Sequence, residues 1–112
     1  MKRKIGILCA SDEELAPFLS MMNFSGIKET KKAMLTFCEG KIKDSDVVAL
    51  YSGVCKVNAA VAAELLIEKF GAEAVISAGT AGGMSEKILI FDTVIAEKCV
   101  YHDVAEDILT EY

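Results

Sequence analysis

The chain has 112 residues, enough for one domain with its own core, and we expect residues 1–112 to form a single domain. It carries 17 acidic and 12 basic residues, and the net charge of -5 argues against a nucleic-acid or anionic-membrane partner. Arg3 is the only arginine, so no guanidinium cluster is available to hold a phosphate dianion. The mean hydropathy of +0.36 is high for a short chain and suggests contact with another subunit.

The cysteines are widely spaced and form no C-x-x-C pair, and one histidine alone could join them as a metal ligand. The sequence therefore predicts no metal site, no cofactor and no disulfide framework. Cys9, Cys55 and Cys99 lie in or beside apolar segments, which predicts small buried side chains in a reducing cytoplasm. The apolar run 5–10 is too short for a signal peptide or a membrane span, so we expect a cytoplasmic protein.

The first predicted elements are a buried strand and a helix. Residues 5–9 form a continuous apolar run, which is typical of a central parallel strand. Ser11 and Glu14 are three residues apart and fit a capping box at the start of a helix. Pro17 would remove a hydrogen bond from that helix, so we expect the helix to begin nearer Glu13 or Glu14.

The middle of the chain has the pattern of β-hairpins. Residues 33–39 and 46–52 are rich in strand-forming residues, and the polar segment 40–45 between them predicts a hairpin connection. Residues 28–32 are strongly charged, which predicts a solvated loop or an edge.

A long helix, a strand and a glycine-rich loop follow. Residues 56–70 predict a helix with an alanine-rich apolar face, ended by Gly71. Residues 74–77 predict a buried strand. The small residues of 77–83 follow this strand, and open α/β sheets bind ligands at such loops. A tight turn without a ligand fits the same spacing. Residues 93–100 predict a last strand. The order indicates an α/β fold with a mixed, largely parallel sheet flanked by helices.

Four patches together resemble the methylthioadenosine/S-adenosylhomocysteine nucleosidases, within the nucleoside phosphorylase superfamily. They are residues 5–10 followed by acids, 52–60, 77–83 and the Tyr-His-Asp of 101–103, in the family's order and at its approximate spacing. The resemblance covers essentially the whole chain, but only the amino-terminal half of the family's enzymes. It implies a truncated nucleoside phosphorylase-like fold.

The resemblance also implies site residues. Glu14 matches the glutamate that orients and deprotonates the attacking water, and helix capping is the alternative role. Thr80, Ala81 and Gly82 match the loop that lines the ribose and base pocket. Val54 matches the apolar wall of that pocket, although a place in the core explains a valine there equally well.

Three further positions bear on the resemblance. His102 is the only histidine and would titrate near neutral pH, but the match places it near a subunit contact, so we expect a structural role. Phe91 stands before Asp92 where the family usually has glycine, which puts the geometry of the following strand in doubt. Phosphorylases of the superfamily hold phosphate with several arginines, so the sole Arg3 favours the members that use water.

Hydrolysis of an N-glycosidic bond needs an acid for the leaving base and a base for the water. The resemblance implies that the acid and the glutamate that grips the ribose belong to the half of the family fold that this chain does not match. We therefore predict a truncated homologue of an adenosine-type nucleoside N-glycosidase, with a remnant of the purine-nucleoside pocket and little or no activity alone. The alternative is an active nucleosidase completed by an oligomeric partner. The expected partners are an adenosine-type nucleoside and further copies of the chain, as a homodimer or higher homo-oligomer that covers an open sheet edge.

Overall fold

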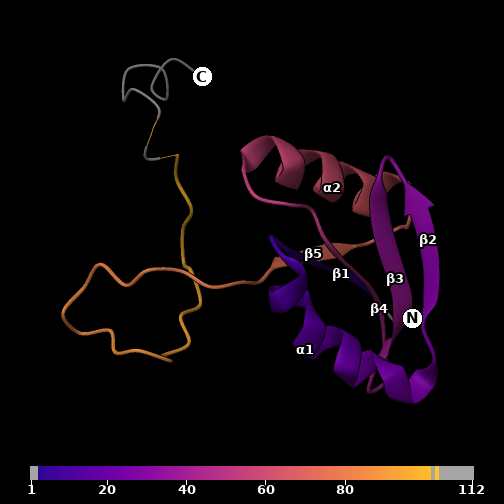
Figure 1. Cartoon of the computed structure of the whole chain (residues 1–112), viewed down its shortest axis with the longest axis horizontal. Coiled ribbons are helices and arrows are strands. Elements are labelled where there is room, and N and C mark those ends of the chain that lie inside the picture. The colour runs from indigo at the N-terminus through magenta and orange to yellow at the C-terminus, as the bar shows by residue number, and fades with distance from the viewer. Residues whose placement is uncertain (1–2, 102, 104–112) are drawn as a thin grey trace. The chain divides into compact units, whose positions relative to one another are not determined.

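The structure is a computed structural model that describes residues 3–101 and 103. The chain divides into two compact units, residues 1–81 and 82–112. Every helix and strand of the described residues lies in the first unit (Figure 1). None of these helices is long and apolar enough to cross a lipid bilayer.

The first unit is built around one five-stranded sheet. In chain order its elements are β1 (Lys4–Cys9), α1 (Asp12–Met22), the 3₁₀ turn η1 (Asn23–Ser25), β2 (Lys28–Lys32), β3 (Leu35–Ile42), β4 (Ser45–Tyr51), α2 (Lys56–Glu68) and β5 (Ala74–Ser77). The strand order is β2-β3-β4-β1-β5. β1 runs parallel to both β4 and β5, whereas β2–β3 and β3–β4 are antiparallel pairs. The predicted mixed α/β sheet flanked by helices is confirmed.

The two helices cover opposite faces of the sheet (Figure 1). Successive residues of β1 point to opposite faces, so Ile7 and Cys9 pack in the cluster with α1 while Leu8 packs in the cluster with α2. Phe37 from β3 is fully buried in the α2 cluster, and its ring stacks on Phe70 with 4.2 Å between centroids. Helices thus pack on both faces of the sheet. The parallel strands β1, β4 and β5 have their carboxyl ends at the same end of the sheet.

Helix α1 begins at Asp12, so the predicted start nearer Glu13 or Glu14 is wrong. Ser11 is the N-cap, and its hydroxyl accepts a hydrogen bond of 3.3 Å from the backbone N–H of Glu14. This cap satisfies a donor of the first turn, so the helix starts there although Pro17 removes one hydrogen bond further along.

The hairpin predicted for residues 33–39 and 46–52 forms as β3 and β4, but β3 begins at Leu35, because Ala33 and Met34 have positive φ and form the turn after β2. Residues 28–32, expected as a loop or an edge, are the edge strand β2 paired with β3. The connection between β3 and β4 consists of residues 43–44, because the ladder continues to the pair Ile42–Ser45. The predicted connection of residues 40–45 was therefore too long.

The predicted strand at residues 93–100 is wrong, since the structure shows no strand there. A strand requires a partner for its backbone hydrogen bonds, and no strand of the described residues pairs with this segment. Phe91, just before it, has φ of +72°, a conformation that favours glycine. His102 and residues 104–112 lie outside the described residues, so the predicted role of His102 stays a prediction.

Two burial predictions also need correction. β5 forms as predicted, but Val75 and Ile76 are 36% and 51% exposed because this strand lies at the edge of the sheet. Cys55 and Cys99 are exposed rather than buried, whereas Cys9 is buried as predicted. All four cysteines are free thiols.

Candidate functional site

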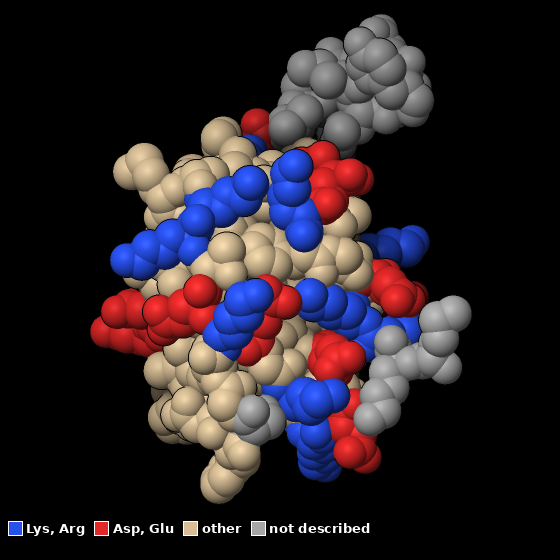
Figure 2. Space-filling model, turned by 90° about the vertical axis from the view of Figure 1, so that its right-hand side faces the viewer, with Lys and Arg blue, Asp and Glu red and all other residues tan. Residues whose placement is uncertain are grey.

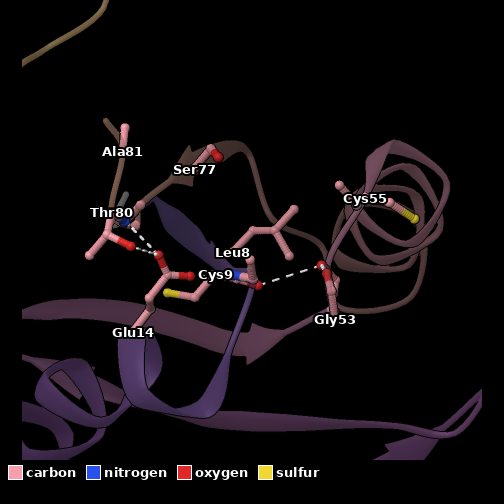
Figure 3. Close-up of a pocket in the computed structure, with 13 residues that line it drawn as sticks. Leu8, Cys9, Glu14, Gly53, Cys55, Ser77, Thr80 and Ala81 are labelled. Atoms are coloured by element: carbon pink, nitrogen blue, oxygen red, sulfur yellow. Dashed lines mark hydrogen bonds between the residues drawn. The ribbon is translucent and has the colours of Figure 1, made fainter. Parts of the chain in front are cut away.

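An open pocket of about 310 Å³ lies at the carboxyl ends of β1, β4 and β5 (Figure 3). It is lined by Leu8, Cys9, Ala10, Glu14, Ser52, Gly53, Cys55, Ala59, Ser77, Ala78, Gly79, Thr80 and Ala81. This is the place where open α/β sheets bind ligands, because the loops that follow adjacent parallel strands come together there. The volume is at the small end of the range for small-molecule sites.

Glu14 is the acidic side chain of the pocket, and it extends from the first turn of α1 toward the loop after β5 (Figure 3). Its Oε2 accepts hydrogen bonds from the backbone N–H of Thr80 at 2.5 Å and from the Thr80 hydroxyl at 3.0 Å. Its Oε1 accepts from the backbone N–H of Ala10 at 3.1 Å. The backbone of Glu14 takes part in helix capping, as predicted, and its carboxylate links the loops that follow β1 and β5. Its role toward water stays a prediction.

These hydrogen bonds, with that from the backbone N–H of Thr80 first, lower the pKa of Glu14. The carboxylate is therefore ionised at neutral pH, and it can accept a proton or orient a water molecule but cannot donate a proton. Burial, together with the negative charge of Glu14, raises the pKa of the neighbouring Cys9 thiol. Cys9 is consequently a neutral thiol at neutral pH.

Gly79 leaves the space that the Glu14 carboxylate occupies. A Cβ atom built at position 79 would collide with this carboxylate, which is the end of a flexible side chain and can move. We expect Gly79→Ala to break the hydrogen bonds to Thr80 and to raise the pKa of Glu14 toward its ordinary value, without unfolding the chain. A carboxyl-detected NMR titration of Glu14 measures this pKa. Gly82→Ala is the control, because a Cβ there meets no atom within 4 Å.

The same hydrogen bonds give stability a defined pH dependence. The pKa of Glu14 is lower in the folded state, so these bonds stabilise the fold above the unfolded-state pKa. That stabilisation is lost as the pH falls through the lowered pKa. Gly79→Ala should flatten this part of the curve of unfolding free energy against pH. An unchanged pKa and an unchanged curve would show that Thr80 does not hold the carboxylate.

The loop between β4 and α2 forms the opposite wall of the pocket. Ser52 is buried, and its hydroxyl donates to the carbonyl of Gly53 at 2.8 Å. Gly53 has φ of +82°, which a glycine adopts without strain. The side-chain amide of Asn58 then donates to the carbonyl of Val54 at 2.8 Å and ties the loop to α2.

Cys55, the N-cap of α2, has φ of +95° and is strained there because it carries a Cβ atom. Its sulfur points away from Glu14 (Figure 3). We expect Cys55→Gly to stabilise the fold by about 1 kcal/mol, the lower end of the usual cost of such a conformation. Urea unfolding of both proteins measures the difference. Val54→Gly is the matched control at a neighbouring residue without positive φ, and a Cys55→Gly variant less stable than the parent would contradict the prediction.

The structure brings together three of the five predicted site residues. Glu14, Thr80 and Ala81 all line the pocket. Val54 is not among the lining residues and is 75% exposed, so the core position considered for it is wrong. Gly82 belongs to the second unit. The pocket roles of Val54 and Gly82 stay predictions.

Other lining residues were not predicted as site residues. They include Cys9 and Ala10 at the end of β1, Ser52 and Cys55 after β4, and Ala59 in α2. The sequence does show that two apolar strands end at these positions. That these ends lie together follows only from the strand order, which places β1 between β4 and β5.

The fold and the site define a class: an open α/β domain with a small-molecule pocket at the carboxyl ends of its parallel strands and one ionised carboxylate in it. The model of the phosphorylase superfamily matches residues 4–111. The chain therefore belongs to the phosphorylase superfamily, and the family resemblance seen in the four sequence patches is confirmed.

Nucleosidases are prominent among the relatives. The chain is 41% identical over 100 residues to a 5′-methylthioadenosine/S-adenosylhomocysteine nucleosidase of Marinomonas sp., a match that covers 89% of this chain and 42% of the relative. The nucleosidase of Colwellia psychrerythraea, solved in complex with adenine, superposes with a TM-score of 0.91 at 34% identity, covering 97% of this chain and 44% of that chain. The futalosine hydrolase of Helicobacter pylori superposes with a TM-score of 0.67 at 30% identity, and the match covers 71% of this chain and 34% of the hydrolase. The chain thus spans less than half the length of these relatives.

Proposed function

We propose that this chain provides one wall of an adenosine-type nucleoside site and has little or no N-glycosidase activity by itself. The observation that carries the proposal is the Glu14 carboxylate, held by Thr80 and Ala10 at the pocket formed by three parallel strand ends. The relatives give the ligand class, since the Colwellia psychrerythraea nucleosidase was solved with adenine and the Streptococcus pneumoniae nucleosidase with 8-aminoadenine.

The chemistry of the pocket supports a water-activating role for Glu14. An ionised carboxylate can orient a water molecule and take its proton as the water attacks the sugar carbon. Departure of adenine requires a proton at the base, and among the described residues Glu14 is the only acid that lines the pocket. Its lowered pKa keeps Glu14 ionised, as the first role requires, and excludes the second role at neutral pH. Among the described residues, the pocket therefore offers a carboxylate that can act as a base and no protonated carboxyl group for the leaving base.

Calorimetric titration with adenine and with 5′-methylthioadenosine tests whether the pocket binds this class of ligand. We expect saturable binding to the parent chain and its loss in Ser77→Trp, which places a large ring at a lining position. Lys31→Trp, the same new side chain on the exposed strand β2, is the control and should bind as the parent does. Absence of binding to the parent, or equal binding to Ser77→Trp, would contradict the proposal.

An active nucleosidase completed by an oligomeric partner is the second candidate. One observation favours it: Ser77, Thr80 and Ala81 are exposed, so this side of the pocket is open for another chain to supply an acid and ribose contacts. Adenine release that rises more steeply than linearly with protein concentration would support it. Release strictly proportional to concentration at every dilution would contradict it.

The homo-oligomer and the cytoplasmic location stay predictions. Exposed valines of α2 support the oligomer, since Val57 and Val61 are 72% and 47% exposed and lie four residues apart on one helix face.

A further inference from the structure

The loop between β4 and α2 forms the wall of the pocket that lies opposite Glu14 (Figure 3). It consists of residues 52–55, of which Ser52, Gly53 and Cys55 line the pocket. Gly53 and Cys55 have φ of +82° and +95°. A residue other than glycine keeps such a conformation only where surrounding contacts hold it. The shape of this wall therefore depends on the groups that bind the loop.

Both ends of the loop are tied to regular structure. At one end, the backbone N–H of Ser52 donates to the carbonyl of Cys9 in β1 at 2.9 Å. At the other end, the carbonyl of Cys55 accepts from the backbone N–H of Ala59 at 3.1 Å, which is the first hydrogen bond of α2. Cys55 is the N-cap of α2, but its side chain makes no capping bond. The start of α2 thus lacks the side-chain bond that usually fixes the path of the chain into a helix.

Asn58 supplies a contact in the middle of the loop. Its side-chain amide donates to the carbonyl of Val54 at 2.8 Å. The same amide nitrogen lies against Gly53, since a Cβ atom built there would be 3.2 Å from it. The Val54 side chain is 75% exposed and adds little packing. Within residues 3–101 and 103, the bond from Asn58 is therefore the hydrogen bond that holds the residue between Gly53 and Cys55.

We propose that Asn58 is a positioning residue for the nucleoside pocket, an inference that rests on the proposed function. Asn58 does not line the pocket itself. By holding the Val54 carbonyl, it fixes the direction in which the chain passes from Gly53 to Cys55, and both of these residues line the pocket. Loss of the bond lets this wall move relative to Glu14, so a ligand must pay for ordering the wall when it binds.

Asn58→Asp separates the position of the loop from the stability of the helix. It keeps the size of the side chain and replaces the amide donor with a carboxylate, which cannot donate to the Val54 carbonyl. A negative charge in the first turn favours the helix, because it lies near the positive end of the helix dipole. We therefore expect weaker adenine binding without loss of helix, a combination that would not arise if Asn58 merely stabilised α2.

Calorimetric titration with adenine measures the effect on the site. The dissociation constant should rise by a factor of about 3 to 10 in Asn58→Asp, the scale of one hydrogen bond, while far-UV circular dichroism stays at the parent level. Asn58→Ala, which removes the donor without adding a charge, should act in the same direction. Parent-like affinity in both variants would overturn the proposal.

Asn23→Asp is the matched control. It makes the same change in an exposed residue just after α1, at the end of this helix away from Glu14. Figure 2, viewed from the side on which β2 lies, shows acidic and basic side chains interspersed. One further exposed carboxylate is thus a small change to the surface, and Asn23→Asp should bind adenine as the parent does. An equal loss of affinity in Asn23→Asp and Asn58→Asp would overturn the proposal.

NMR relaxation of the backbone amides tests the inference without a ligand. The order parameters of residues 53–55 should fall from about 0.85 in the parent toward about 0.6 in Asn58→Asp, whereas those of Ser52 and Ala59 stay at the parent values. Unchanged order parameters at residues 53–55 would overturn the proposal. A parent that does not bind adenine would contradict the proposed function, and the order parameters would then decide by themselves whether Asn58 holds the loop.

Discussion

The 112-residue chain by itself is expected to release adenine from 5′-methylthioadenosine more slowly than the Marinomonas sp. nucleosidase, by a factor of about 10² to 10⁴ or more. This factor is the usual rate contribution of one general acid. The physical reason is the protonation state of the pocket. Glu14 is held as an anion by Thr80 and Ala10, and burial keeps the Cys9 thiol a weak acid. The ionised carboxylate has no proton to give to the departing base, and a thiol of raised pKa is a poor general acid.

A coupled assay for adenine on both purified proteins, under identical conditions, measures this ratio. Glu14→Gln in the present chain is the internal control, since it keeps the size of the side chain and removes its basicity. Residual release that is the same in the parent and in Glu14→Gln would be background. Release at the rate of the relative, abolished by Glu14→Gln, would show the proposal of a silent chain to be wrong.

Phe37→Ala is expected to destabilise the fold by about 3–5 kcal/mol, the usual range for removing a buried phenylalanine. The ring is fully buried and stacks on Phe70 at 4.2 Å, so its loss leaves a cavity between β3 and the end of α2. Small domains unfold with about 5–15 kcal/mol, so this one change removes a large share of the total. Urea unfolding followed by circular dichroism measures the difference.

Phe24→Ala is the matched control, because Phe24 is 97% exposed and the same atoms are removed. It should change the free energy of unfolding by less than about 0.5 kcal/mol. If Phe37→Ala does not fold at all, Phe37→Leu retains most of the apolar volume and should show a smaller loss in the same direction. Equal effects at positions 37 and 24 would contradict the assignment of Phe37 to the core.

Three residues of the pocket lining were predicted through the family resemblance, and their positions agree with local sequence patterns. Glu14 stands at the start of a helix after a strand, and Thr80 and Ala81 stand in a loop of small residues after another strand. Local patterns fix which residue types end each strand. They do not show that Glu14 and Thr80, 66 residues apart, share two hydrogen bonds. They do not show either that Cys55 takes a conformation suited to glycine.

The sequence by itself determined the α/β class, the hairpins and the position of the glycine-rich loop, because each of these depends on residues close together in the chain. It also determined the family, because four separate patches occur in the family's order and approximate spacing. The tertiary structure alone decided that β5 is an exposed edge, that residues 93–100 form no strand, and that the Glu14 carboxylate is held by Thr80. Strand pairing, burial and hydrogen bonds between distant residues depend on which segments become neighbours. A pattern of apolar residues predicts that a segment will pair or be buried, but whether a partner is there to pair with it is a property of the folded chain.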